Sequence, residues 1–259
     1  ESQNLLAKAS LLNDKTKGAF NISSETMIKM LTIREDLWAA IKILIGQQEL
    51  NEDEFLLVYV MSAKTGETYT EDKLVAILQR AAEICSTLNT NAQYKDLKTV
   101  FFGEKLDLTN MGHFRSLLWI SEYSLETNME DLLIRLQTAA KLKVPVERAF
   151  GNINLKLAEN LSQDISGLQT LLSWAELSKT YGEAKIIQLL STIENNSALI
   201  QRISGESVAH ANPNILTGLS TIGTDQESTS LFVWIAAMML RADNERSPDQ
   251  VTAALERME

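Results

Sequence analysis

The sequence has few of the residues that interrupt helices or build catalytic centres. Of its 259 residues only three are proline, at Pro145, Pro213 and Pro248, while one is cysteine and two are histidine. Proline removes a backbone donor and clashes with the preceding helical turn, so its scarcity favours a mostly helical chain. The single cysteine, Cys85, excludes an intramolecular disulfide framework and fits a reducing compartment.

Long apolar runs are also missing. The longest, Leu231 to Leu240, is about half of the roughly 20 residues that a membrane-spanning helix needs. No positively charged segment followed by an apolar one opens the sequence, so a secretory signal is not expected. We therefore expect a soluble, intracellular protein.

The charge balance is acidic, with a formal net charge of −10 at pH 7. This charge counts against a protein that covers nucleic acid with a large uniform basic face, although a local basic groove remains compatible with it. Hydrophobic residues make up 45% of the chain, which is ample for a packed core and argues against global disorder.

Apolar residues recur at helical spacing through most of the chain. The clearest stripe follows the capping residue Thr70 and runs through Leu74, Ile77, Leu78, Ala81, Ile84, Cys85 and Leu88. Such patterns predict an all-α fold, a two-lobed helical bundle of roughly ten to twelve helices. The stripe also places Cys85 in the core, where a thiol without an activating neighbour is inert.

Residues 98–109 are the one plausible β element. Thr99 to Phe102 and Lys105 to Leu108 flank Gly103-Glu104, a pattern that predicts a small β-hairpin. The alternative is a loop held to the core by its phenylalanines.

The proline positions suggest a division of the chain. Val144-Pro145 predicts a helix break, because the residue before proline is pushed out of helical geometry. We therefore expect an N-terminal lobe over residues 23–144 and a C-terminal lobe over 145–259. Residues 1–22 are expected to form an N-terminal arm, and docking of this arm on its own core is an equally good interpretation.

Motifs for catalysis and cofactor binding are missing. The chain has no phosphate-binding loop, dinucleotide fingerprint, nucleophile elbow, Cys-x-x-Cys pair or calcium loop. His113 and His210 belong to no paired metal-ligand motif. We therefore expect no enzyme activity, cofactor or metal. An enzyme or small-molecule binder with a site that only the tertiary structure assembles is kept as a second alternative.

The leading functional hypothesis is a non-enzymatic structural or assembly protein that acts through protein–protein contacts and self-association. The candidate self-association residues are the arm leucines Leu5, Leu6, Leu11 and Leu12. A second candidate contact is the charge-poor segment from Ser204 to Thr224 around Pro213, since surfaces that face a partner are poor in charge. The alternative is that this segment is only a flexible connection.

The first alternative is a nucleoprotein or capsid-type protein that binds RNA in a cleft between the two lobes. Its candidate basic residues are Lys95, Lys98, Lys105, Arg115, Lys141, Lys143 and Arg148. Base stacking would also need an aromatic side chain beside a basic one. The four tryptophans lie in apolar helical segments that predict core positions, and Trp119, which follows Arg115 by one turn, is the candidate for such a stacking surface.

Overall fold

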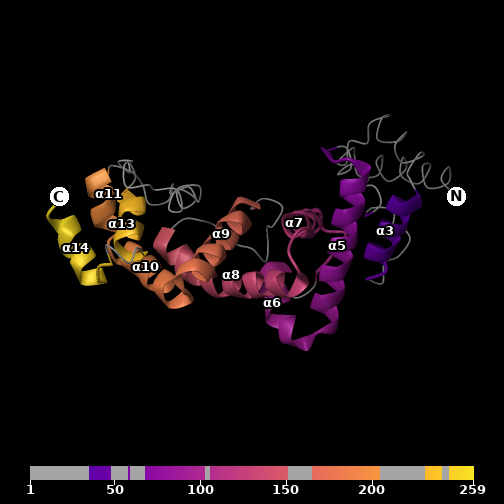
Figure 1. Cartoon of the computed structure of the whole chain (residues 1–259), viewed down its shortest axis with the longest axis horizontal. Coiled ribbons are helices and arrows are strands. Elements are labelled where there is room, and N and C mark those ends of the chain that lie inside the picture. Colours follow the sequence, from indigo (N-terminus) through magenta and orange to yellow (C-terminus); the bar gives the residue numbers. More distant parts are fainter. Residues whose placement is uncertain are drawn as a thin grey trace. The chain divides into compact units, whose positions relative to one another are not determined.

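A computed structural model describes residues 35–47, 58, 68–102, 106–150, 165–204, 231–240 and 245–259 (Figure 1). These residues form ten α-helices and one short 3-10 helix, and within the described ranges there is no β-strand. The predicted all-α fold is confirmed. The predicted arm, residues 1–22, and its leucines Leu5, Leu6, Leu11 and Leu12 lie outside the described residues, as does the charge-poor segment from Ser204 to Thr224 except for Ser204 itself.

The chain divides into two compact units that meet in sequence between Met129 and Glu130. The first unit contains α3 (Glu35–Ile45), α5 (Glu71–Thr90), the 3-10 helix η2 (Ala92–Tyr94), α6 (Lys95–Phe102) and α7 (Met111–Tyr123). The second contains α8 (Met129–Phe150), α9 (Ile165–Tyr181), α10 (Glu183–Asn195), α11 (Ser197–Ser204), α13 (Leu231–Leu240) and α14 (Pro248–Glu256).

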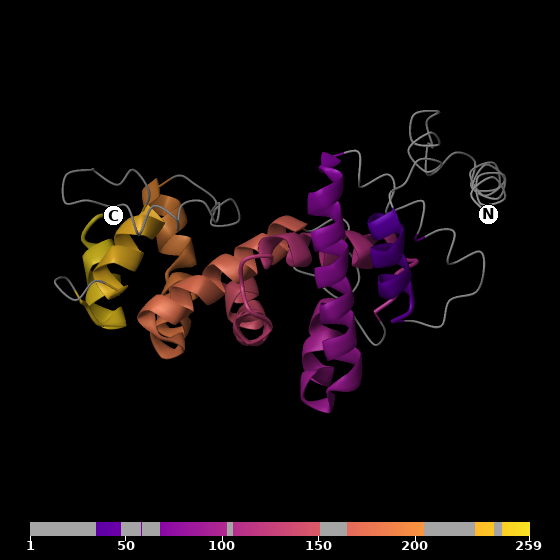
Figure 2. The same ribbon diagram turned by 45° about the vertical axis from the view of Figure 1, so that its right-hand side comes forward.

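Helix α5 forms the centre of the first unit. The Thr70 side chain accepts a hydrogen bond from the Lys73 backbone N–H, and Glu71 and Asp72 lie in the first turn, where acids favour helix formation. The predicted stripe is buried, and Cys85 is fully buried within it. Helix α3 lies alongside α5 in both views of the ribbon (Figure 1 and Figure 2), and α7 packs on α5 as well.

Helix α7 begins directly after Asn110. The Asn110 side chain caps it by accepting hydrogen bonds from the backbone N–H groups of Gly112 and His113, at 2.8 and 3.3 Å. Residues on most sides of the helix, including Phe114, Leu117 and Ile120, are then buried. A helix buried on so many sides has only a narrow strip left for solvent.

The second unit has an aromatic core. Trp174 of α9 is fully buried and packs against Phe150 of α8, which also contacts Phe232 of α13, with ring centroids 5.8 and 6.1 Å apart. Helices α9 and α10 join at Gly182, whose φ of 92° favours glycine. Helix α14 starts at Pro248 behind a Ser247 capping box.

The hairpin predicted near residues 98–109 is wrong. Residues 95–102 form helix α6, and the described residues after it, 106–110, form a turn rather than a strand. Leu97 and Phe101 lie one helical turn apart and are both buried, so helical spacing prevails over the β propensity of Thr99 to Phe102.

The helix break predicted at Val144-Pro145 is also wrong, because α8 continues through Pro145 to Phe150. Proline costs this helix one backbone hydrogen bond. The turns around it bury Leu142, Val146 and Phe150, and this packing offsets the loss.

Candidate interaction face on helix α7

The exposed strip of α7 carries aromatic and basic side chains. Arg115, Trp119 and Tyr123 are spaced four residues apart and therefore follow one another along the same side of the helix. Arg115 is exposed, Trp119 is partly exposed, and Tyr123 is 39% exposed. We call these three residues the α7 face. Of the four tryptophans predicted to lie in the core, Trp174 is fully buried, whereas Trp38, Trp119 and Trp234 are partly exposed.

The two rings of the α7 face stack on each other. Their centroids are 5.5 Å apart and their planes differ by 16°. Stacking at this distance limits the freedom of both side chains, so a partner would lose little side-chain entropy on binding them. Trp119 and Tyr123 thus present a fixed aromatic surface.

A polar cluster holds the C-terminal end of α7 against the start of α5. The Tyr69 hydroxyl donates a hydrogen bond to one Glu122 carboxylate oxygen at 2.6 Å, and the Lys73 ammonium pairs with the other. A lysine at a helix start and a glutamate at a helix end each place a charge beside a helix terminus of the same sign, which is unfavourable. The pair compensates both charges, and we call these three residues the Glu122 cluster.

The cluster shifts two pKa values in opposite directions. Burial by itself would raise the pKa of Glu122, but the hydrogen bonds from Lys73 and Tyr69 together with the Lys73 charge outweigh burial and lower it. The pKa of Tyr69 is raised to about 12, first by burial and then by the hydrogen bond to the Glu122 carboxylate and its charge. At neutral pH, Glu122 is therefore charged and Tyr69 is neutral.

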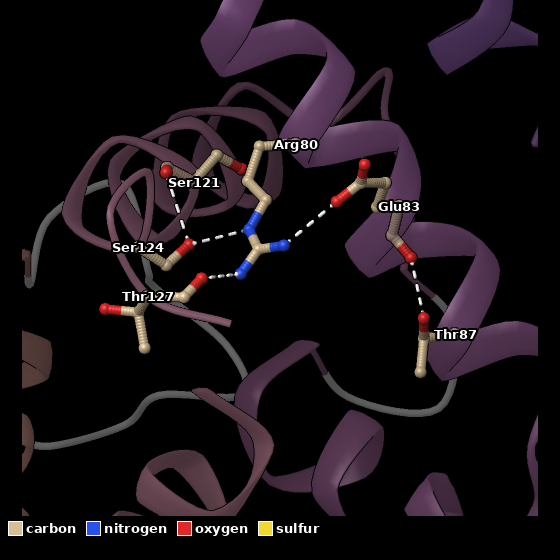
Figure 3. A network of polar contacts seen from close by, with 6 residues as sticks. All are labelled: Arg80, Glu83, Thr87, Ser121, Ser124 and Thr127. Carbon is tan, nitrogen blue, oxygen red and sulfur yellow. Dashed lines mark hydrogen bonds and ion pairs between the residues drawn. The ribbon is translucent and has the colours of Figure 1, made fainter. Parts of the chain in front are cut away.

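Arg80 fixes the turn that follows α7 (Figure 3). Its guanidinium donates hydrogen bonds to the Ser124 hydroxyl at 3.2 Å and to the Thr127 carbonyl at 2.6 Å, and it pairs with Glu83 at 2.9 Å. The Ser124 hydroxyl in turn donates to the Ser121 carbonyl. Because the Arg80 side chain is only 12% exposed, these charge-assisted bonds form with little competition from water.

Opposite charges stand at the two ends of the α7 face. Arg115 precedes the aromatic pair, and Glu126 follows it in the turn. Both side chains are exposed, and neither forms an ion pair or hydrogen bond with any residue that the structure describes. The turn also exposes Leu125, at 37%.

The basic residues predicted to bind nucleic acid fall in both units. In the first, Lys98 donates a hydrogen bond to Asn89, and Arg115 belongs to the α7 face. In the second, Lys141 pairs with Glu183 at 3.1 Å, Lys143 pairs with Glu147 at 3.3 Å, and Arg148 is exposed. Lys105 and the side chain of Lys95 lie outside what is described. The ion pairs reduce the positive charge that Lys141 and Lys143 offer to phosphate.

The titratable residues considered for catalysis have structural surroundings. His113 Nδ1 accepts a hydrogen bond from the Asp107 backbone N–H, and its ring meets Phe102 edge-on. Burial lowers the pKa of His113, against an opposing effect of Asp107. Burial raises the pKa of Cys85 to about 12, with a smaller opposing effect of Lys98, so its thiol stays neutral. Among the described residues no group of His, Cys, Asp or Glu could hold a metal ion.

Two surface grooves contain no residue of the α7 face. One, of about 530 Å³, runs between α3 and α5 beside the exposed Ile43. The other, of about 340 Å³, runs beside Ile134 of α8 and includes Arg135 and Glu183. Neither is lined by histidine or cysteine, and His113 lies in neither. His210 is outside the described residues.

Comparisons with known proteins give no relative: no protein-family model matches the chain, and neither a curated protein nor a solved structure shows a significant match. None of the helices in the described ranges has both the length and the hydropathy needed to cross a lipid bilayer.

Sequence reasoning identified part of this face. Arg115 was identified one turn before Trp119, whereas Tyr123 and the nearby Glu126 were not identified. The four-residue spacing of Arg115, Trp119 and Tyr123 was a signal that could have found the face, because this spacing keeps side chains on one side of a helix. Exposure could not be read in the same way, since α7 is apolar on several sides.

Proposed function

We propose that this protein is a non-enzymatic, α-helical assembly protein that acts through protein–protein contacts and associates with itself. The observation that carries the proposal is the stacked and exposed pair of Trp119 and Tyr123 beside Arg115. Tryptophan, tyrosine and arginine are the residue types that dominate the binding energy of protein interfaces.

The supports of the α7 face also favour this function. The Glu122 cluster and Arg80 fix the end of α7 and the following turn with hydrogen bonds from two positions on α5. A face held in one conformation loses less entropy when it binds. The arm leucines Leu5, Leu6, Leu11 and Leu12 remain a second proposed contact for self-association.

Size-exclusion chromatography with light scattering and absorbance at two wavelengths tests the proposal. We expect a mass above that of one chain at high protein concentration, without co-purified nucleic acid. The change Tyr123→Ala should shift the protein toward the monomer, because it removes the exposed ring. Tyr94→Ala, which alters a partly exposed tyrosine of η2, is the matched control and should leave the mass unchanged.

The same experiment separates the alternatives. A monomer at every concentration, or an oligomer equally unaffected by both substitutions, would contradict a role of the α7 face in self-association. Replacing the four arm leucines with serine tests the arm separately. Nucleic acid that co-purifies and dissociates as salt is raised would favour the nucleoprotein alternative.

A further inference from the structure

We infer that the partner of the α7 face is a second copy of this chain, arranged so that the two α7 helices run antiparallel across a two-fold axis. The inference rests on the proposed function and specifies the partner of the same face. In such a contact each surface binds its own copy, so the surface must be complementary to itself.

The order of residues along α7 meets this requirement. A two-fold axis that sets Trp119 opposite Tyr123 of the second copy also sets Arg115 opposite the turn that follows α7, within one residue in sequence of Glu126. The length of the arginine side chain covers this offset of one residue. Aromatic rings therefore meet in the middle of the contact, and opposite charges meet at both of its ends.

The charges beside the aromatic pair fit the same arrangement. Arg115 and Glu126 are exposed and have no ionic partner among the described residues, so both are available to a second copy. Glu122 lies between them in sequence but is already compensated by Lys73 and bonded to Tyr69. Two copies of Glu122 near the axis would therefore repel each other less than free carboxylates would.

A second copy fits this charge pattern better than nucleic acid does. Among the described residues 111–128, which form α7 and the following turn, the acidic and basic residues without a partner are Arg115 and Glu126. Single-stranded nucleic acid is bound by aromatic side chains in a groove with an excess of basic residues. One base at one end and one acid at the other instead favour a second copy in the antiparallel orientation, because its acid then faces the base and its base faces the acid.

The contact is small. Arg115 to Tyr123 span about 12 Å of helix, whereas stable interfaces bury about 1,200–2,000 Å² in total. We therefore expect a reversible dimer whose population rises with protein concentration, unless other surfaces add to the interface.

Charge exchange across the predicted pair tests the arrangement, with dissociation constants from sedimentation equilibrium on the full chain. Arg115→Glu alone and Glu126→Arg alone should each raise the dissociation constant by at least about tenfold, because each dimer would then contain two like-charge pairs. The double variant Arg115→Glu/Glu126→Arg should return to within about threefold of the original chain, since both pairs are restored in reverse.

Mixing the two single variants gives a sharper test. Each should be largely monomeric alone, but an equimolar mixture should form a dimer. In the mixed dimer, the glutamate introduced at position 115 of one chain faces the arginine introduced at position 126 of the other. The unchanged Glu126 of the first chain faces the unchanged Arg115 of the second. Arg148→Glu on α8, also an exposed arginine, is the control and should leave the dissociation constant unchanged. Far-UV circular dichroism and the melting temperature check that every variant is folded.

The outcomes separate the inference from the proposed function. If Tyr123→Ala weakens association but neither the double variant nor the mixture restores it, the antiparallel pairing is wrong while the assembly function stands. If the original chain is monomeric throughout, both fail. Restored association in both charge-exchange experiments supports the inference.

Discussion

The regions around Trp119 and Trp174 use the same residue in opposite ways. Trp174 is fully buried in the second unit, where it packs on Phe150, and its indole N–H finds no acceptor among the described residues. Trp119 in the first unit is partly exposed and stacks on Tyr123, while hydrogen bonds fix the chain around it. In the second unit the aromatic surface is buried in the core, whereas in the first unit part of it stays accessible to solvent.

This comparison shows how a face can be both exposed and well ordered. The aromatic core of the second unit is stabilised by removal of apolar area from water. Around the end of α7, the Glu122 cluster and Arg80 supply polar contacts instead. Such contacts hold the helix in place without covering the rings.

The largest expected effect comes from changing each tryptophan to alanine. Trp174→Ala should lower the free energy of unfolding of the second unit by about 3–5 kcal/mol, because it leaves a cavity among Phe150 and its neighbours. Trp119→Ala should cost about 1–2 kcal/mol, since part of its ring is already in water. Urea denaturation followed by circular dichroism measures both. Equal decreases in the free energy of unfolding would contradict the different burial of the two tryptophans.

A smaller effect is expected from Arg80→Ala. It removes hydrogen bonds to Ser124 and Thr127 from a mostly buried guanidinium and should lower the free energy of unfolding by about 2 kcal/mol. Arg148→Ala serves as the control, because surface substitutions of this kind usually change stability by less than about 0.5 kcal/mol. Urea denaturation compares the two, and similar values would mean that Arg80 does not hold the turn.

The smallest effect concerns pH and the Glu122 cluster. Because the folded state lowers the pKa of Glu122, its stabilising contribution is present above the ordinary glutamate pKa and is lost as pH falls through the folded value. Tyr69 has the opposite sign: its contribution is present below the ordinary tyrosine pKa and is lost as pH rises through about 12.

We therefore expect the original chain to be more stable than Glu122→Gln near neutral pH, and this difference to shrink as acid protonates Glu122. The free energy of unfolding of both proteins, measured by urea denaturation across the acidic range, tests this. A difference that stays constant with pH would show that the Glu122 charge does not stabilise the cluster.

Local patterns in the sequence determined the helical fold and the start of α5. Thr70 was identified from capping chemistry, and the α5 stripe from its spacing. These features depend on residues within one or two turns of each other, so the sequence displays them directly. Residues 98–109 and Pro145 were misjudged because packing of Phe101 and Val146 prevails over local propensity.

Only the tertiary structure decided which side chains are covered and which charges are paired. Lys73 and Glu122 are 49 positions apart, and Arg80 and Thr127 are 47 apart, so no local pattern links them. Trp119 and Trp174 both lie in apolar helical segments, and their different exposure depends on which helices pack over them. The sequence alone therefore predicted helices and the neighbours Arg115 and Trp119, whereas tertiary packing left Tyr123 exposed and stacked on Trp119.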